Sequence, residues 1–462
     1  MNRPVFIGEH ATIEAAAAAM AGAVQDWARA SSEPVSSVRW EAEVPDTDPL
    51  AWLHHHPHLI RMYCSNRERL LQIAAIGVAD MLRFKDDATD LHAALDAIFS
   101  RLDELPEGVR YYGGMRFHDH GLATDSSWQR FGRVRFVVPS LELIRDDRRS
   151  RLCANIVLSD GWRRDVDMLL ALLKRVVTPP ALPAAHLPMP LNRINLPDRE
   201  RWEVMMQRAL QLLTEGPLEK IVLARRCVFD FGEPLNPMAL LQRLREATPD
   251  SFHFCFNYGD EIAFIGATPE RLYQRHGAHV LSEALAGTRP RGATEEDDRW
   301  LESELLASAK ERSEHRLVAD AITSTLRELG GEVDRHAAPE VLKLSHVQHL
   351  RTLIRCTLPR PVSDADLLLA LHPTPAVGGL PKADASRHIA ELEPFDRGWY
   401  AAPIGWAMRD QVEFAVAIRC ALVEGSRLAL FSGAGIMPAS DPEQEWREIE
   451  SKIGNFLRIL TT

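Results

Sequence analysis

The spacing of apolar and polar residues along the chain predicts two kinds of element. Apolar residues that recur every three or four positions are typical of helices with one buried face, whereas short apolar runs and alternation are typical of strands. The predicted helices cover residues 11–24, 164–176, 200–214, 236–246, 297–330, 363–371 and the C-terminal segment. The predicted strands cover residues 133–138, 151–158, 219–229, 252–257, 262–265, 271–275, 278–282, 347–357, 401–408, 412–422 and 426–432. Because strands occur in runs as well as singly, this order favours an α+β fold with mostly antiparallel pairing over a doubly wound nucleotide-binding fold.

One segment lacks periodicity and is rich in proline. It covers residues 177–199, and such a composition predicts an extended connector. Residues 1–190 before it are less distinctive, whereas most of the candidate functional residues lie within residues 200–462. The alanine-rich stretch at residues 11–24 contains Glu14 and is only weakly apolar, so it predicts a helix rather than a signal peptide.

Composition narrows the class of protein. The chain has 462 residues, of which 46% are hydrophobic and 26% are charged, which is enough for a large buried core. Its formal net charge is -11 and it has no long basic run, so neither nucleic acid nor an anionic membrane is the expected partner. No apolar run is long enough to span a membrane. Its six cysteines are scattered, which argues against a zinc site or a disulfide framework and favours a cytoplasmic protein.

The C-terminal segment places charged residues beside an apolar stripe. After Ser432–Ile436, a predicted helix carries Glu445, Glu448 and Lys452 on one narrow face. The neighbouring apolar stripe consists of Trp446, Ile449, Ile453, Phe456, Leu457 and Leu460. Such a pattern is often only a ladder of ion pairs on a solvated flank. It also suits a binding site at the edge of a buried face.

Lys220, Glu270 and the segment Gly287–Thr288 each have a functional interpretation and a simpler structural one. Lys220 lies in a predicted strand with apolar residues on both faces, where burial would favour its neutral form and suit a general base. A lysine at a strand end that reaches water is the simpler alternative. Glu270 follows Pro269 and could merely be exposed. Gly287 and Thr288 form a predicted turn after a strand, either a plain loop or backbone N–H groups that hold an anion.

The long predicted helix contains a carboxylate on an apolar face. Glu314 shares this face with Leu317 and Val318, and a buried unpaired charge is very costly. Its partner could be Arg312, His315, a cation from another segment, or a metal ion. Oxygen-only ligation by glutamates from two helices is typical of Mg²⁺, and Glu448 is the natural second ligand.

A series of motifs resembles the chorismate-utilising enzymes. In order along the chain they are KIVLAR with Lys220, GATPERL with Glu270, ALAGTRPRG, SEH with Glu314, VQHL, LHPTPAVGG, DRGWYAAPIGW, VAIRCAL with Arg419, SGAGI and EWREIESK. They run in register across residues 200–460, and GGMRF at residues 113–117 and FVVP at residues 136–139 resemble the family more weakly. The resemblance implies one large domain of two packed, mainly antiparallel sheets surrounded by helices. Residues 1–190 would contribute to this fold, and residues 200–462 would form the chorismate-binding catalytic region.

Within the family the chain is most similar to isochorismate synthases of the menaquinone or salicylate-siderophore type. This resemblance implies that Lys220 activates water for attack at C2 of chorismate and that Glu270 protonates the departing C4 hydroxyl. It also implies Mg²⁺ as cofactor, held by Glu314 and Glu448 with Glu445 supporting it through water. The implied substrate-binding groups are Gly287, Thr288 and Lys452 at the ring carboxylate, Tyr400, Arg419, Gly433 and Gly435 at the enolpyruvyl carboxylate, and His349 near the ring.

The choice of subfamily depends on few positions. Family members that use ammonia usually carry glutamine where Lys220 stands, and aminodeoxychorismate synthases often carry a lysine where Ala286 stands. The chain is therefore expected to use water and to need no glutaminase subunit. Salicylate synthases share the lysine but then eliminate pyruvate, and they remain an alternative, although the loop with His372 resembles the isochorismate synthase version. A non-catalytic chorismate-binding homologue is the other alternative. The family also makes a monomer the expected state.

Overall fold

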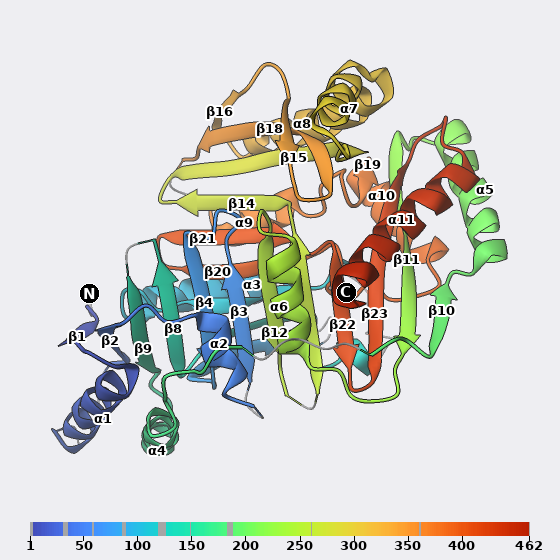
Figure 1. Cartoon of the computed structure of the whole chain (residues 1–462). Coiled ribbons are helices and arrows are strands. Elements are labelled where there is room, and N and C mark those ends of the chain that lie inside the picture. Colours follow the sequence, from blue (N-terminus) through green and yellow to red (C-terminus); the bar gives the residue numbers. More distant parts are fainter. Residues whose placement is uncertain are drawn as a thin grey trace.

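Two large sheets form the centre of the protein, and helices lie around them (Figure 1). The structure is a computed structural model, and it describes residues 3–30, 36–57, 60–85, 89–118, 126–147, 149–182, 188–259, 261–359 and 362–461. Within these residues every strand pair is antiparallel except β1 with β2. The predicted α+β fold with two packed, mainly antiparallel sheets is therefore confirmed.

The first sheet draws its strands from both ends of the chain. In spatial order it contains β1 (Val5–Glu9), β2 (Val38–Val44), β9 (Ser150–Ile156), β8 (Leu141–Asp146), β4 (Leu71–Ile76), β3 (Arg61–Ser65), β12 (Phe252–Asn257), β13 (Ile262–Thr268), β22 (Cys420–Glu424), β23 (Arg427–Ile436), β11 (Lys220–Asp230) and β10 (Asn192–Leu196), with β19 (Gly379–Leu380) paired to β11.

The second sheet is built in the same mixed way. In spatial order it contains β16 (Glu332–Arg335), β18 (Val347–Thr357), β15 (His279–Pro290), β14 (Arg271–His276), β21 (Gln411–Val416), β20 (Pro403–Met408), β6 (Tyr111–Met115), β7 (Val134–Val138) and β5 (Asp80–Phe84), with β17 (Glu340–Lys343) paired to β18. Tyr112 on β6 donates a hydrogen bond across the interface to Glu142 on β8 at 2.5 Å. The two sheets therefore pack face to face.

The helices cover the outside of both sheets. They are α1 (Ile13–Ala30), α2 (Pro49–His54), α3 (Leu91–Glu104), α4 (Trp162–Leu173), α5 (Arg199–Glu215), α6 (Pro237–Ala247), α7 (Glu295–Ala307), α8 (Ala309–Glu328), α9 (Asp364–Leu371), α10 (Lys382–Leu392) and α11 (Pro442–Thr461). Helix α8 packs on β15 and β18, and α11 packs on β23 (Figure 1). None of the described helices is both long and apolar enough to cross a membrane.

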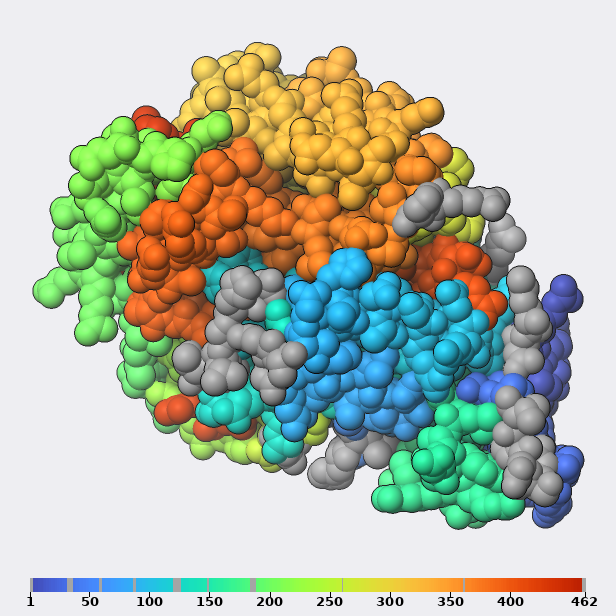
Figure 2. All heavy atoms as spheres, turned by 180° about the vertical axis from the view of Figure 1, so that it is seen from behind, coloured from blue at the N-terminus to red at the C-terminus, as the bar shows by residue number. Residues whose placement is uncertain are grey.

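Distant parts of the chain share one surface. In the view from behind, blue atoms of the first hundred residues lie against orange atoms of the last quarter (Figure 2). Helix α3 packs on α9 there, and His92 lies 2.9 Å from Asp366 between them.

In the interior, Gly398 has φ +54° and lies so close to Trp128 that an added Cβ would come within 2.0 Å of the indole. A side chain at residue 398 would therefore displace part of the aromatic core.

Several predicted elements differ from the observed ones. The predicted helix over 297–330 is two helices, because Ser308 ends α7 and accepts a hydrogen bond from the N–H of Glu311 at the start of α8. The predicted strand over 412–422 is two strands, β21 and β22, which belong to different sheets. Within the predicted connector, residues 183–187 lie outside the described residues and residues 192–196 form β10.

Candidate active site

Lys220 and Glu314 meet where β11 begins. The Lys220 side chain is fully buried, and its Nζ donates to Oε1 of Glu314 at 2.8 Å. Of the partners considered for Glu314, the structure shows a cation from another segment, Lys220. Burial opposes ionisation of Glu314, but the charge and hydrogen bond of Lys220 outweigh it and lower the pKa of this carboxyl.

Gly435 leaves room for this ion pair. It lies on β23 beside β11, where a Cβ at residue 435 would stand 2.8 Å from Oε1 of Glu314 and 2.9 Å from Cε of Lys220. Both distances are shorter than any real Cβ contact, so the ion pair and a side chain at residue 435 cannot both fit without movement. The glycine of the SGAGI motif is thus a steric requirement of the lysine site.

Glu270 lies where the chain passes from one sheet to the other. It follows β13 of the first sheet and precedes β14 of the second, and only 4% of the residue is exposed. The interpretation of Glu270 as an exposed residue after a proline is therefore wrong. Burial and the charge of Glu283 raise its pKa to about 8, while Lys220 and the hydroxyl of Thr374 oppose the rise. Glu270 accordingly holds a proton at neutral pH and can serve as a general acid.

His349, Thr288 and Arg419 form a hydrogen-bonded chain. His349 on β18 lies opposite Thr288 on β15, with its Nδ1 2.9 Å from the hydroxyl of Thr288. Its Nε2 lies 3.1 Å from Nη2 of Arg419. Because a guanidinium can only donate, Nε2 of His349 accepts and the ring is neutral. Burial, Arg419 and Lys452 hold the pKa of His349 well below its usual range.

The predicted turn at residues 287–288 is part of a strand. Strand β15 continues to Pro290, and Gly287, with φ +80°, forms a β-bulge in its pairing with β18. A Cβ at residue 287 would stand 3.2 Å from Glu311. The N–H of Thr288, predicted to be able to hold an anion, donates to the carboxylate of Glu311 at 3.3 Å.

A second group of predicted residues lies along β23 and α11. Lys452 donates to the carbonyl of Gly433 at 3.0 Å and pairs with Glu448 at 2.7 Å. The hydroxyl of Tyr400 lies 3.1 Å from where a Cβ of Gly433 would stand, so both face one space. Arg419 has φ +48°, and burial lowers its pKa to about 10, which leaves it cationic at neutral pH.

The three predicted metal-ligating carboxylates lie on two helices. Glu445 is buried and accepts from the hydroxyl of Ser440 at 2.8 Å, whereas nearly half of the Glu448 side chain is exposed. Lys452 and Lys310 both act electrostatically on Glu314 and on Glu445, so α8 and α11 face each other here. Among the described residues no three acidic, histidine or cysteine side chains stand close enough together to hold a metal ion.

His372 is buried and forms a hydrogen bond within the protein. Its Nε2 is 3.1 Å from the carbonyl of Phe117, and burial and Lys382 lower its pKa to about 3.

Four residues beside the predicted site residues were not predicted from the sequence, namely Arg67, Glu283, Glu311 and Thr374. The only sequence signal for Glu283 is an acidic residue in the apolar run before ALAG.

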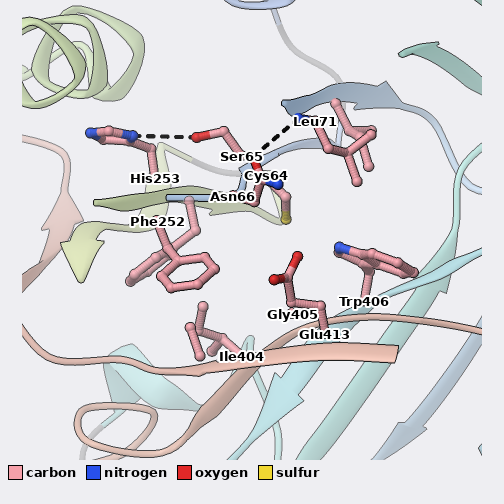
Figure 3. A pocket seen from close by; sticks show the side chains of 13 residues that line it. Cys64, Ser65, Asn66, Leu71, Phe252, His253, Ile404, Gly405, Trp406 and Glu413 are labelled. Carbon is pink, nitrogen blue, oxygen red and sulfur yellow. Dashed lines mark hydrogen bonds between the residues drawn. The ribbon is translucent and has the colours of Figure 1, made fainter. Parts of the chain in front are cut away.

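A separate cavity lies between the two sheets. Figure 3 shows Phe252 and Cys64 of the first sheet facing Ile404, Trp406 and Glu413 of the second. None of the predicted site residues lines it. It is therefore distinct from the residues around Lys220.

The fold and this site point to an enzyme, since a buried lysine and a buried glutamic acid lie among cationic groups. The family model described as "Chorismate binding enzyme" matches residues 22–461, and the chain belongs to this family.

The chain aligns with most of the length of several relatives in the family. The chain is 32% identical over 422 residues to isochorismate synthase MenF of Haemophilus influenzae, with 91% of each protein covered. It is 35% identical over 362 residues to the salicylate biosynthesis isochorismate synthase of Pseudomonas aeruginosa, covering 78% of this chain and 75% of that protein. The solved structure of MenF, the menaquinone-specific isochorismate synthase of Escherichia coli, has a TM-score of 0.84 at 29% identity and covers 96% of this chain and 100% of that one.

Proposed function

We propose that this protein is an isochorismate synthase, which converts chorismate to isochorismate. The observation that carries the proposal is that a buried lysine, Lys220, lies near enough to a buried glutamic acid, Glu270, for its charge to act on that acid. Lys220 takes a proton from water as the water oxygen bonds to C2 of the ring. The ring double bonds shift, the C4–O bond breaks, and Glu270 gives its proton to the departing hydroxyl. Water is both consumed and released, so the reaction is an isomerisation.

The remaining predicted residues bind the two carboxylates of chorismate. Arg419, Tyr400 and the backbone of Gly433 and Gly435 hold the enolpyruvyl carboxylate, for which a planar guanidinium is well suited. Lys452 and the backbone at Gly287 and Thr288 hold the ring carboxylate, for which the N–H of Thr288 must exchange its present partner Glu311, and His349 lies beside the ring as a neutral imidazole. The chain from Arg419 through His349 to Thr288 supports this assignment, because it links the two binding regions.

Mg²⁺ is the proposed cofactor. The donor set fits a hard cation, since Glu314, Glu448 and Glu445 offer only carboxylate oxygens on two helices that face each other. Glu314 and Glu448 would bind the ion and Glu445 would support it through water. When bound, Mg²⁺ supplies positive charge for the ring carboxylate. The lysines that now pair with Glu314 and Glu448 show that both carboxylates are already in contact with cationic groups.

Several further features belong to the proposal. Lys220 in place of glutamine and Ala286 in place of lysine support water as nucleophile and a protein without a glutaminase subunit. We expect a cytoplasmic monomer in which residues 200–462 carry the catalytic region. Salicylate synthase remains the alternative, and the names of the relatives support isochorismate as the product.

The test is to incubate the purified protein with chorismate and Mg²⁺, with and without a chelator, and to separate the products by chromatography. Isochorismate at a fixed ratio to chorismate, lost on chelation, is the expected result. Salicylate with pyruvate would move the protein to the alternative, and the absence of any product would refute both activities.

A further inference from the structure

A buried ion pair lies beside Glu270, and neither of its two residues was among the predicted site residues. Arg67 lies just after β3, in the N-terminal part of the chain, and Glu283 lies on β15. The guanidinium of Arg67 binds Glu283 through both arms, at 2.7 Å from Nη1 to Oε1 and 3.0 Å from Nη2 to Oε2. The side chain of Arg67 is 6% exposed and that of Glu283 is fully buried. This bidentate geometry fixes the orientation of both groups.

The same ion pair binds the backbone on both sides of Glu270. Nη1 of Arg67 donates to the carbonyl of Pro269 at 2.9 Å, and Oε1 of Glu283 accepts from the N–H of Arg271 at 3.1 Å. Two further contacts hold residue 270 itself, whose N–H lies 3.3 Å from the hydroxyl of Thr268 and whose carbonyl accepts from Val416. The carbonyl before the acid and the N–H after it are thus tied to one rigid pair.

We propose that Arg67 and Glu283 form a positioning pair that sets the location and the protonation of Glu270, and that the N-terminal part of the chain contributes to catalysis through Arg67. This inference rests on the proposed role of Glu270 as the acid. A buried ion pair contributes little net stability compared with apolar residues of the same size, so stability alone does not account for the pair.

Charge supports the same assignment. Glu283 and Lys220 are the charged groups that act on Glu270, the first favouring its protonated form and the second opposing it, and the nearby hydroxyl of Thr374 also opposes it. The Arg271 side chain is directed to Glu413 at 3.0 Å and Glu68 at 3.5 Å, and Arg351 lies 4.0 Å from Glu283. Arg67 balances the charge of Glu283. Removing the Glu283 charge should therefore lower the proton affinity of Glu270, and removing the Arg67 charge should raise it.

The test compares Glu283→Gln and Arg67→Met with the wild type by measuring kcat and KM for isochorismate formation between pH 6 and pH 10. Glu270 acts in its protonated form, so activity falls on the alkaline side as it ionises. Glu283→Gln removes a negative charge and should move this alkaline limb to lower pH. Arg67→Met removes a positive charge and should move it to higher pH. Both changes should lower kcat about 10- to 100-fold with little change in KM, because the acid is misplaced while the carboxylate-binding groups are intact.

A matched control is available in another buried pair. Glu142 binds Arg39 and Tyr112 in the core and is fully buried, so Glu142→Gln makes the same chemical change away from Glu270. It should leave the alkaline limb unmoved, and thermal unfolding monitored by circular dichroism checks the fold of every variant. Arg67→Lys keeps the charge but cannot make the bidentate contact, so it should lower kcat without shifting the alkaline limb. This variant tests the positioning role even if Arg67→Met does not fold.

The outcomes separate this inference from the proposed function. If folded Glu283→Gln and Arg67→Lys keep wild-type kcat and the wild-type alkaline limb, the positioning role is overturned while the activity stands. If the limb shifts in the same direction in both charge variants, the electrostatic part is overturned. If the wild type forms no isochorismate, the proposed function fails first.

Discussion

Replacing Glu270 by glutamine should make the protein more stable at alkaline pH while removing its activity. Burial and the charge of Glu283 raise the pKa of Glu270 from 4.5 to about 8. Each pH unit of this difference corresponds to about 1.36 kcal/mol, so ionising Glu270 in the folded protein costs roughly 5 kcal/mol more than in the unfolded chain. Glutamine has nearly the shape of the protonated acid and never ionises, so Glu270→Gln avoids this cost.

The direction of the pH dependence follows from proton binding. Below pH 4.5 Glu270 is protonated in both the folded and the unfolded states, and it has no effect on stability. Between pH 4.5 and 8 the folded protein keeps a proton that the unfolded chain releases, so the free energy of unfolding falls as pH rises. Above pH 8 the loss is complete. Between pH 5.5 and 9 the wild type should therefore lose about 3 kcal/mol relative to Glu270→Gln.

Reversible urea unfolding of both proteins at pH 5.5 and pH 9 measures this difference. All other groups titrate in both proteins, so their contributions cancel in the comparison. Glu233→Gln, at an exposed glutamate, is the control and should behave as the wild type at both pH values. A Glu270→Gln protein that gains no stability over the wild type between pH 5.5 and 9 would contradict a buried, protonated Glu270. Isochorismate formation should fall about 10²- to 10⁴-fold in the same variant.

Three other substitutions test the rest of the site. Lys220→Ala should lower isochorismate formation by about 10²-fold or more while leaving a folded protein, since it removes the base; a fully active variant would refute that role. Gly435→Ala places a Cβ 2.8 Å from Glu314, so it should lower the free energy of unfolding by about 1–3 kcal/mol and reduce kcat, as measured by urea unfolding and product assay. Glu448→Gln should raise the Mg²⁺ concentration for half-maximal activity by about tenfold or more, because even loss of an outer partner of a metal site often costs that much; an unchanged Mg²⁺ requirement would remove Glu448 from the ligand set.

Motifs and periodicity predicted the fold class, which the structure confirms, and they also named the candidate site residues. Strand β11 was predicted within a residue at each end, and Lys220 lies on it in the buried setting that its apolar neighbours indicated. The glycines at residues 433 and 435 were predicted only from the family resemblance. Their physical reason, the lack of room beside Tyr400 and beside the Lys220–Glu314 pair, depends on segments far apart in the chain.

Other features depend on contacts that one sequence cannot reveal. Arg67 lies in a turn with no periodic pattern, and its partner Glu283 is 216 residues away. Lys220 and Glu314 are 94 residues apart, so only the folded chain distinguishes a lysine partner from the nearby Arg312 and His315. The break between α7 and α8 did have a signal, since Ser308 followed by Glu311 three residues later is the start of a capping box. The apolar pattern across the break is continuous, and for this reason it predicted one helix.

Burial affects both Glu314 and Glu270, but the nearest charge lowers the pKa of Glu314 and raises that of Glu270. Glu314 contacts the ammonium of Lys220, which outweighs burial and keeps it ionised. Glu270 lies beside the charge of Glu283, which adds to burial and keeps it protonated. An acid and an anionic ligand can therefore coexist in one site at a single pH because each carboxylate has a different nearest charge. Since the Glu283 charge is itself held in place by Arg67, the proton on Glu270 depends on a residue from the part of the chain with the least distinctive sequence.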